Sequence, residues 1–233
     1  HLCLTCFILA RPQPLNPQPD WTSSYSVSIV VPTKNEAGNV PAIFEETPNV
    51  GKWTELMFVD GHSDDGTVEA IEKHIQEYKS KWKRIQLLHQ TGKGKGQAVR
   101  QAFEACRGDI LMILDSDLTM PAHELPKYYE AIANNTGEFI NGSRLVYPMG
   151  RQAMRFLNMI ANKTFAILFT WLLNQPVKDT LCGTKVLKRT DYLKIAANRS
   201  HFGNFDPFGD FDLLFGAAKL NLKLIDMPIR YQD

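Results

Sequence analysis

The sequence places two carboxylates, Asp115 and Asp117, directly after the apolar run at residues 110–114. An uninterrupted apolar run of this length is typical of a buried strand in a parallel sheet. Ligands of open α/β sheets bind beyond the carboxyl ends of such strands. Two hard oxygen donors suit Mg²⁺ or Mn²⁺, and Mg²⁺ commonly completes its coordination with water and substrate phosphates. The pair therefore indicates a metal-bound diphosphate, with a solvated Asp-Ser-Asp turn as the alternative.

Polar residues follow two earlier apolar runs in the same way. Val31-Pro32-Thr33-Lys34-Asn35-Glu36 ends the first run, and Val59-Asp60-Gly61 ends the second. Gly61 permits a tight turn, and the polar residues at 64–67 can cap the helix that follows, which leaves Asp60 without an evident structural task. A carboxylate there can accept hydrogen bonds from a base N–H or from ribose hydroxyls. A helix cap is the alternative role for Asp60.

A glycine-rich segment, Thr91-Gly92-Lys93-Gly94-Lys95-Gly96, precedes a predicted helix. It lacks the Gly-Lys-Ser/Thr ending of a P-loop, which excludes the P-loop NTPase class. Backbone N–H groups and lysines at a helix N-terminus nevertheless suit an anionic group. A solvated loop is the alternative.

The composition predicts one large α/β domain and sets limits on its function. The 233 residues are 44% hydrophobic and 22% charged, and the formal net charge of +1 gives no argument for a nucleic-acid partner. Four cysteines are too few for a disulfide scaffold and are expected to be reduced. Cys3 and Cys6 lack a second ligand pair for zinc.

The N-terminal segment is predicted to lie outside the domain. The chain begins with His1 and is expected to be a fragment, because residues 2–10 are apolar but lack the charged region of a secretory signal. Residues 11–20 carry four prolines, which is typical of an extended linker. The predicted organisation is a tail and linker over 1–24 and one domain over 25–233.

Apolar runs alternate with amphipathic stretches through the first part of this domain. Strands are predicted at 27–31, 56–59, 85–89, 110–114 and 138–141, and helices near 38–47, 66–80, 95–106 and 122–134. This alternation predicts a mostly parallel central sheet with helices on both faces.

A further helix is predicted over residues 151–173. Leu157, Ile160, Ala161, Leu168, Trp171 and Leu172 recur at helical spacing. The uncharged part is shorter than the roughly 20 apolar residues that a bilayer span needs. Packing of this stripe on the sheet is favoured, while the aromatic content leaves an interfacial role open.

The order of these motifs resembles glycosyltransferase family 2, which has the GT-A (Rossmann-like) fold. Pro-Thr-Lys-Asn-Glu, Val-Asp-Gly-x-Ser-x-Asp-Gly-Thr, Gly-Lys-Gly-x-Ala and Asp-Ser-Asp are followed by Asn141-Gly142-Ser143-Arg144, Arg155, Asp179-Thr180-Leu181-Cys182-Gly183-Thr184-Lys185, and segments at 205–214 and 227–231. This succession is similar to the dolichyl-phosphate mannose synthase and polyprenyl-phosphate glycosyltransferase branch. The resemblance covers residues 27–231.

The resemblance implies an inverting, metal-dependent hexosyltransferase that uses Mg²⁺ or Mn²⁺. The donor would be GDP-mannose or a UDP-sugar, and the acceptor a polyprenyl or dolichyl phosphate at a membrane surface. The implied donor-binding residues are Pro32, Thr33, Glu36, Asp60, Lys95, Asp115 and Ser116, and the implied metal ligands are Asp115 and Asp117. The implied catalytic residues are Asp210, Asp212, Arg144, Arg155 and Lys185, of which the three basic ones match positions directed at phosphates.

The acceptor determines whether a base is needed. A polyprenyl phosphate is already anionic at neutral pH, whereas a hydroxyl acceptor would use Asp210 or Asp212 as general base. A family member with a saccharide hydroxyl acceptor and a non-catalytic sugar-nucleotide-binding module are the alternatives. A nucleotidyltransferase is disfavoured because no glycine-rich signature follows the first strand.

The expected location is cytoplasmic, with peripheral attachment at the cytoplasmic membrane face. No transmembrane hairpin follows residue 231, so attachment would depend on other elements or on further sequence. The sequence leaves the oligomeric state open.

Overall fold

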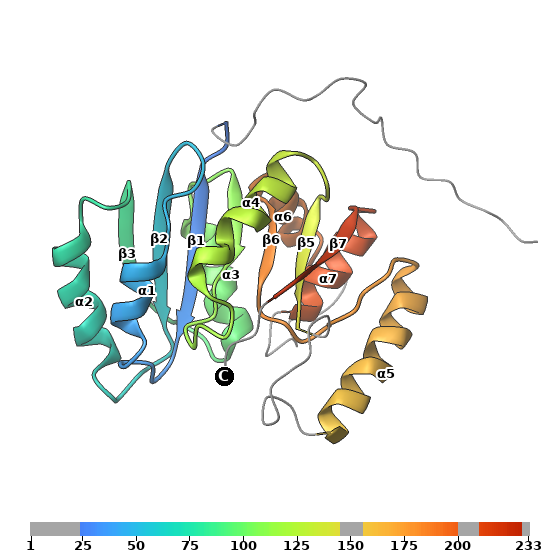
Figure 1. Cartoon of the computed structure of the whole chain (residues 1–233), viewed down its shortest axis with the longest axis horizontal. Coiled ribbons are helices and arrows are strands. Elements are labelled where there is room, and N and C mark those ends of the chain that lie inside the picture. The colour runs from blue at the N-terminus through green and yellow to red at the C-terminus, as the bar shows by residue number, and fades with distance from the viewer. Residues whose placement is uncertain (1–23, 145–155, 200–209, 230–233) are drawn as a thin grey trace, which may run out of the picture.

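The computed structural model describes residues 24–144, 156–199 and 210–229 (Figure 1). The strands are β1 (Val27–Thr33), β2 (Thr54–Asp60), β3 (Arg84–His89), β4 (Ile110–Ile113), β5 (Phe139–Ser143), β6 (Lys185–Lys188) and β7 (Leu224–Pro228). The helices are α1 (Val40–Glu46), α2 (Thr67–Tyr78), α3 (Lys95–Ala105), η2 (Ala122–Glu124), α4 (Leu125–Ala133), α5 (Phe156–Leu173), α6 (Arg189–Ala197) and α7 (Asp210–Lys219). The predicted tail and linker, Cys3, Cys6 and Arg155 lie outside the described residues.

The strands form one seven-stranded sheet in the order β3-β2-β1-β4-β6-β5-β7. β1, β2, β3 and β4 are parallel, and so are β5 and β7, whereas β6 is antiparallel to both β4 and β5. The carboxyl ends of six strands and the beginning of β6 therefore lie at one edge of the sheet. The predicted mostly parallel sheet is confirmed.

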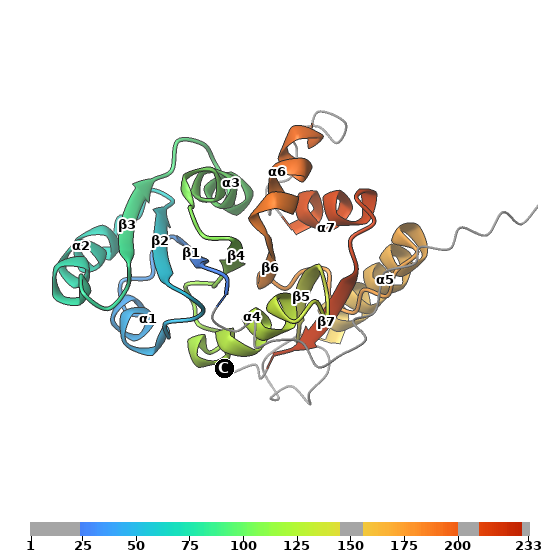
Figure 2. The same cartoon turned by 90° about the horizontal axis from the view of Figure 1, so that it is seen from above.

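β1 shows how the sheet divides the core. Val27, Ile29 and Val31 pack with α1, α2 and α4 on one face, and Val30 packs with α3, α6 and α7 on the other. Successive side chains of a strand point to opposite faces, so a strand that is apolar at all these positions needs cover on both. Figure 2 shows the helices on the two sides of the sheet, as predicted.

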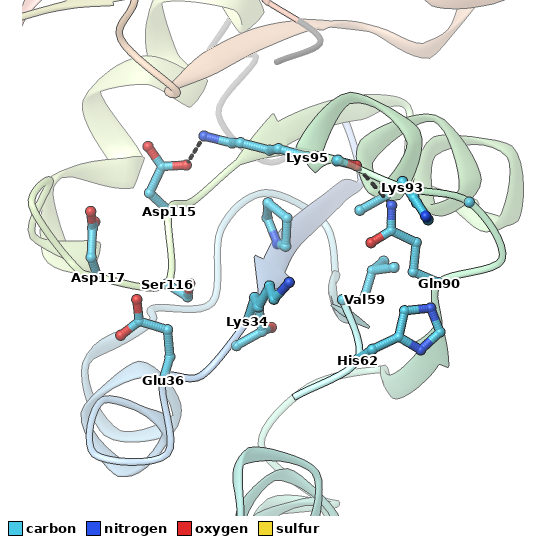
Figure 3. A pocket seen from close by; sticks show the side chains of 16 residues that line it. Lys34, Glu36, Val59, His62, Gln90, Lys93, Lys95, Asp115, Ser116 and Asp117 are labelled. Atoms are coloured by element: carbon cyan, nitrogen blue, oxygen red, sulfur yellow. Dashed lines mark hydrogen bonds and ion pairs between the residues drawn. The ribbon is translucent and has the colours of Figure 1, made fainter. Parts of the chain in front are cut away.

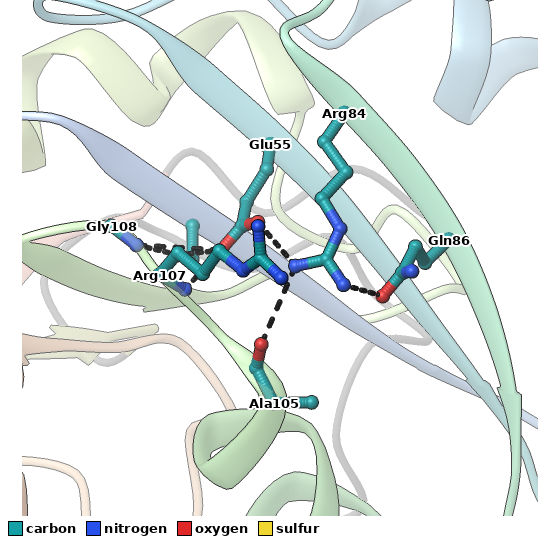
Figure 4. A network of polar contacts seen from close by, with 7 residues as sticks. Glu55, Arg84, Gln86, Ala105, Arg107 and Gly108 are labelled. Carbon is teal, nitrogen blue, oxygen red and sulfur yellow. Dashed lines mark hydrogen bonds and ion pairs between the residues drawn. The ribbon is translucent and has the colours of Figure 1, made fainter.

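A buried carboxylate, Glu55, organises the opposite edge of the sheet (Figure 4). It accepts hydrogen bonds from the Ser28 hydroxyl at 2.5 Å, from the Arg107 backbone N–H at 2.5 Å and from Arg84 Nη1 at 3.3 Å. The Gly108 N–H donates to the same Ser28 hydroxyl at 2.8 Å. These contacts supply hydrogen-bond acceptors to the backbone N–H groups of the turn that leads into β4, the strand that precedes Asp115.

The first five strands and first four helical segments agree with the sequence-based prediction to within a few residues, which is the usual uncertainty of element ends. The helix predicted at 122–134 begins as the 3₁₀ turn η2 and continues as α4. β6, α6 and β7 were not predicted. Cys106 and Cys182 are free and buried, as expected of reduced thiols.

Helix α5 lies at the periphery of the fold, beside α7 (Figures 1 and 2). Its buried side chain Phe169 stacks on Phe211 of α7 at a centroid distance of 5.4 Å. Leu168, Trp171 and Leu172 are 49%, 79% and 55% exposed, so the prediction that this stripe packs on the sheet was wrong for these three residues. The side chains of the other three, Leu157, Ile160 and Ala161, lie outside the description. Helical spacing predicts that a helix has an apolar face, but it does not predict which element that face contacts. No helix of the described residues has the length and apolar character needed to span a bilayer.

Candidate active site

A cavity of about 650 Å³ opens at the carboxyl ends of β1, β2 and β4 (Figure 3). Its lining comprises Pro32, Thr33, Lys34, Glu36, Val59, Gly61, His62, Gln90, Gly92, Lys93, Gly94, Lys95, Ala98, Asp115, Ser116 and Asp117. The three motifs at the strand ends and the glycine-rich loop thus meet in one place. All the predicted donor-binding residues line this cavity except Asp60.

Hydrogen bonds join the loop after β1 to the loop after β2. The Asn35 N–H donates to Ser63 Oγ at 2.9 Å, and the Asp64 N–H donates back to Asn35 Oδ1 at 3.0 Å. The Glu36 N–H donates to Thr67 Oγ1 at 2.9 Å. Asn35 has a φ of 56°, a left-handed conformation that asparagine tolerates better than most residues. The two loops therefore form a single rigid wall of the cavity.

Asp60 has a structural task that the sequence did not reveal. Its carboxylate accepts hydrogen bonds from the backbone N–H groups of His62, at 3.0 Å, and of Ser63, at 3.2 Å. The residue is 3% exposed. These contacts close a side-chain turn over residues 60–63, which is the way aspartate commonly stabilises loops. The interpretation that Asp60 lacks a structural role was therefore wrong, and its predicted contact with the nucleoside stays a prediction.

The Asp-Ser-Asp segment forms a tight turn. The Leu118 N–H donates to the Asp115 carbonyl at 3.1 Å, and the Thr119 N–H donates to Asp117 Oδ1 at 3.0 Å. Leu118 has a φ of 53°, which is unfavourable for a side chain with a Cβ. Such strain persists only where surrounding contacts impose it, and it is common at functional sites. The turn keeps both carboxylates at the cavity.

Lys95, the first residue of α3, forms an ion pair with Asp115. Gly183 lies directly over this pair, because a Cβ built on Gly183 would collide with the Asp115 carboxylate and the Lys95 ammonium. Only glycine permits such a close approach without displacing one of the two charged groups. The loop before β6 thus closes over the carboxylates from the other half of the chain.

The donor atoms at this point fit a divalent cation that shares its coordination with a ligand. Asp115 already accepts a cationic group, Lys95, and Asp117 is exposed beside it. No cluster of three or more His, Cys, Asp or Glu side chains suited to a metal occurs within the described part of the chain. Mg²⁺ is commonly held by one or two carboxylates, with waters and substrate phosphates completing its shell. Asp115 and Asp117 are the residues that would hold it.

A second cavity, of about 110 Å³, shares Lys95, Asp115 and Asp117 with the first. Its other lining residues are Thr119, Arg144, Leu181, Cys182, Gly183, Thr184 and Ile229. Burial raises the pKa of the Cys182 thiol to about 11, so this thiol is neutral at physiological pH and is not activated as a nucleophile. The two aspartates therefore lie between a large cavity and a small one.

Arg144 reaches the small cavity from the end of β5. Its Nε donates to Asp179 Oδ2 at 2.9 Å and its Nη2 donates to Asp179 Oδ1 at 3.1 Å. Asp179 is fully buried. Two parallel N–H···O bonds fix the plane of a guanidinium as well as its position. Arg144 is thus held in a defined orientation beside Asp115 and Asp117.

A comparison with known protein families identifies the family to which the chain belongs. The family described as Glycosyl transferase family 2 matches residues 28–195, which contain both cavities' strand-end motifs. The chain belongs to glycosyltransferase family 2. The resemblance seen in the motifs is therefore confirmed at the level of the family.

Curated relatives of this family 2 chain include transferases named for polyprenyl-type phosphates. It is 27% identical over 216 residues to glycosyltransferase AglJ of Haloferax volcanii, covering 92% of this chain and 64% of that protein. It is 35% identical over 122 residues to a dolichol-phosphate mannosyltransferase of Pyrococcus furiosus, covering 52% of this chain and 33% of that protein. It is 26% identical over 229 residues to a dolichyl-phosphate beta-glucosyltransferase of Trichomonas vaginalis. The chain spans less than two thirds of the first two relatives.

Solved structures confirm the GT-A fold. Glucosyl-3-phosphoglycerate synthase of Mycobacterium tuberculosis matches 91% of this chain with a TM-score of 0.66 and 18% identity, covering 75% of that protein. A mannosyltransferase of Pyrobaculum calidifontis, in complex with GDP-Man and Mn²⁺, matches 93% of this chain with a TM-score of 0.59 and 20% identity, covering 58% of that protein. At these identities the likeness concerns the fold.

Two further predicted residues of this family 2 domain, Lys185 and Asp212, line neither cavity. Lys185 is fully buried in β6, and its Nζ donates to the Cys182 carbonyl, beneath the loop that lines the small cavity. Asp212, on α7, is 6% exposed and pairs with Arg199 at 2.9 Å and with Arg100 at 3.3 Å. Asp210 begins α7, and its side chain is outside the description, as is Arg155.

Sequence reasoning missed several residues that line or support the site. Lys34, His62, Gln90 and Lys93 line the large cavity, and Asp179 orients Arg144. Lys93 lies in the glycine-rich segment and Asp179 begins the 179–185 segment, but the sequence did not indicate that Asp179 would pair with Arg144. His62 follows the turn glycine, Gly61, and its residue type alone gave no sign that it would line the cavity.

Proposed function

We propose that this chain is the catalytic domain of an inverting glycosyltransferase that moves a hexose from a nucleoside-diphosphate sugar to a polyprenyl phosphate. The observation that carries the proposal is the position of Asp115 and Asp117 between two cavities. The larger has room for a nucleotide sugar, and the smaller is lined by Arg144. Two cavities that share Asp115 and Asp117 suit a reaction between two phosphate-bearing substrates, because the phosphates of both substrates can meet at these aspartates.

The donor diphosphate binds at the carboxylate end of the large cavity. Asp115 and Asp117 would hold Mg²⁺ or Mn²⁺, which would supply positive charge to neutralise the departing diphosphate. The amino end of α3 faces the cavity through Gly94 and Lys95, and its backbone N–H groups and dipole favour an anion. Lys95 adds a positive charge at the same place. These groups stabilise the leaving group as its bond to the sugar breaks.

The acceptor phosphate enters from the small cavity. Its oxygen forms a bond to the anomeric carbon on the face opposite the diphosphate, and the bond between that carbon and the diphosphate oxygen breaks in the same displacement, which inverts the configuration. Arg144, oriented by Asp179, aligns the incoming phosphate, since guanidinium groups match phosphate oxygens geometrically.

The environment of Asp212 argues against one of the two general bases, Asp210 and Asp212, predicted for a hydroxyl acceptor. A hydroxyl needs a general base within hydrogen-bond reach of its proton. Asp212 is instead bound by Arg199 and Arg100, and among the described residues it lines neither cavity. A phosphate oxygen is anionic at neutral pH and needs no base. The relatives named for dolichyl and undecaprenyl phosphates support the same choice.

Helix α5 supports the proposal that the acceptor is taken from a membrane. Phe165, Ile167, Leu168, Trp171 and Leu172 are between 47% and 79% exposed. The sequence from 139 to 190 carries one acidic residue, Asp179, which is buried, while Lys163 and Lys178 are exposed. Exposed apolar and aromatic side chains in a segment without surface acids are typical of helices that lie on anionic lipid surfaces. We propose that α5 contacts the bilayer that presents the acceptor.

A binding and transfer experiment tests the function. The chain is titrated with GDP and UDP, with and without Mn²⁺, and then incubated with GDP-mannose or UDP-glucose and either a polyprenyl phosphate or a free oligosaccharide. We expect one nucleotide to bind in a Mn²⁺-dependent manner and sugar to appear on the polyprenyl phosphate. The variant Asp117→Ala should lose the Mn²⁺-dependent part of binding, whereas Asp64→Ala, an exposed carboxylate outside the cavity lining, should not. Transfer to the oligosaccharide alone would overturn the acceptor assignment.

A further inference from the structure

The end of the large cavity opposite the two aspartates is formed by side chains with a different chemistry. In Figure 3, Asp115, Asp117 and Glu36 lie at one end, while His62, Gln90 and Lys93 lie at the other. Val59 contributes an apolar surface between them. A ligand with its diphosphate at the carboxylates must place its nucleoside toward His62 and Gln90, because the cavity continues in that direction.

The backbone of His62 is held in an unusual conformation. Its φ is 62°, in the left-handed region where residues with a Cβ are uncommon. The Asp60 carboxylate imposes this conformation by accepting the N–H groups of His62 and Ser63. A buried aspartate is thus used to present an exposed imidazole at the cavity. Conformations of this kind cluster at active sites and ligand-binding sites.

The neighbouring wall at Gln90 is equally well fixed. The Gln90 backbone N–H donates to the Asp60 carbonyl at 2.9 Å, and its side-chain Nε2 donates to the Gly94 carbonyl at 2.7 Å. A Cβ on Gly61 would lie 3.2 Å from Gln90 Oε1, so glycine at 61 keeps this wall close to the His62 turn. His62 therefore lines the cavity near a polar side chain, Gln90, whose position is fixed by hydrogen bonds.

We propose that His62 binds the nucleobase of the donor, with its planar ring against the base. The inference rests on the proposed function and deepens it, since it names the residue that distinguishes a nucleotide from a bare diphosphate. Nucleobases stack on histidine and other flat side chains, and the loss of one such contact weakens binding by about tenfold.

The test separates the base from the diphosphate. Calorimetric titrations with GDP, UDP and inorganic pyrophosphate, each with Mn²⁺, are compared for the unsubstituted chain, His62→Gly and His62→Asn. Glycine and asparagine both tolerate a positive φ, so the imidazole is removed without disturbing the turn. The control is His89→Ala, which removes an exposed imidazole next to Gln90 but outside the cavity lining. Thermal unfolding of each variant verifies that it is folded.

We expect His62→Gly and His62→Asn to bind the preferred nucleotide about tenfold more weakly, with pyrophosphate affinity unchanged. His89→Ala should bind both as the unsubstituted chain does. Unchanged nucleotide affinity in both His62 variants would overturn the inference, and so would an equal loss for nucleotide and pyrophosphate, although either result would leave the transferase proposal standing. Failure of the unsubstituted chain to bind any nucleotide would overturn both.

Discussion

Arg144 and Asp179 lie 35 residues apart in the chain and form a bidentate ion pair beside the two cavity aspartates. The Arg144 backbone N–H also donates to Asp179 Oδ2, at 3.1 Å, and the Leu181 N–H donates to Oδ1 at 3.1 Å. One buried carboxylate therefore ties the end of β5 to the loop that precedes β6. This loop carries Gly183 over Asp115, so the pair organises the small cavity as well as the arginine.

Removal of Arg144 should destabilise the fold as well as reduce transfer. Arg144→Ala removes a bidentate ion pair to the buried Asp179, and the free energy of unfolding should fall by about 2–3 kcal/mol, below the range for fully buried pairs because the Arg144 side chain is 22% exposed. Urea denaturation measures this loss. In a double-mutant cycle with Asp179→Asn, the two effects should be strongly non-additive, and simple additivity would contradict a direct pair.

Gly183→Ala should abolish Mn²⁺-dependent nucleotide binding while the domain stays folded. The added methyl group would occupy the space of the Asp115 carboxylate and the Lys95 ammonium, so one of them must move away from the site. Calorimetric titration with the preferred nucleotide measures the effect. Gly38→Ala is the matched control, because a Cβ at Gly38 meets no heavy atom within 4 Å. Equal binding by both variants would contradict the close approach described for Gly183.

Glu55→Ala should lower the free energy of unfolding by about 3 kcal/mol, because it removes the acceptor shared by the Arg107 N–H, the Ser28 hydroxyl and Arg84 Nη1. The exposed Glu72→Ala should change it by less than about 0.5 kcal/mol. Chemical denaturation of the two variants gives the comparison. Nucleotide affinity at low temperature should be the same in both, since Glu55 lies at the sheet edge opposite the cavities.

Substitution of the exposed apolar face of α5 should remove vesicle binding without a cost in stability. Ile167 and Trp171 are 73% and 79% exposed, so Ile167→Ser with Trp171→Ser should leave the unfolding midpoint unchanged. Co-sedimentation with vesicles containing anionic lipid should fall several-fold. Leu193→Ser, an exposed leucine on α6, is the control and should bind as before. Undiminished sedimentation of the double variant would exclude α5 as the lipid-binding surface.

Asp226 should make the domain less stable as pH rises. Burial raises the pKa of its carboxyl above 3.8, against the opposing effect of the hydrogen bond from Asn141. Between the unfolded value of 3.8 and the higher folded value, the folded state binds more protons than the unfolded state, so its stability falls with increasing pH. The free energy of unfolding of the natural chain minus that of Asp226→Asn should therefore decrease from pH 3.5 upward. An increase would contradict the raised pKa.

The first half of the fold was accessible from sequence because its strands are continuous apolar runs. The strands around residues 27–31 and 110–114 end in recognisable polar motifs, and the two aspartates and the glycine-rich loop meet as the topology predicts. The later strands gave weaker signals. β6 is short and has lysine at both ends, and β7 ends in proline, so neither shows a periodic pattern.

Contacts between distant residues account for the rest of what the sequence did not show. The pairing of Asp179 with Arg144, of Asp212 with two arginines, and of Asp60 with its own turn depends on tertiary geometry. The exposed face of α5 had the same apolar spacing that a buried face would have. Residue type and spacing indicate which interactions a side chain can make, but only the folded structure shows the residue with which it makes them.

Because β6 runs antiparallel to its neighbours, the loop before it reaches the edge of the sheet where the two cavities lie. Among the described residues, the lining of the large cavity comes from residues 32–117, whereas the small cavity adds residues 119, 144, 181–184 and 229. Changes in the loop before β6 can therefore reshape what approaches the aspartates without altering the nucleotide cavity. Exchange of this loop between relatives should therefore change the preferred acceptor while the preferred donor stays the same, both in evolution and in engineered variants.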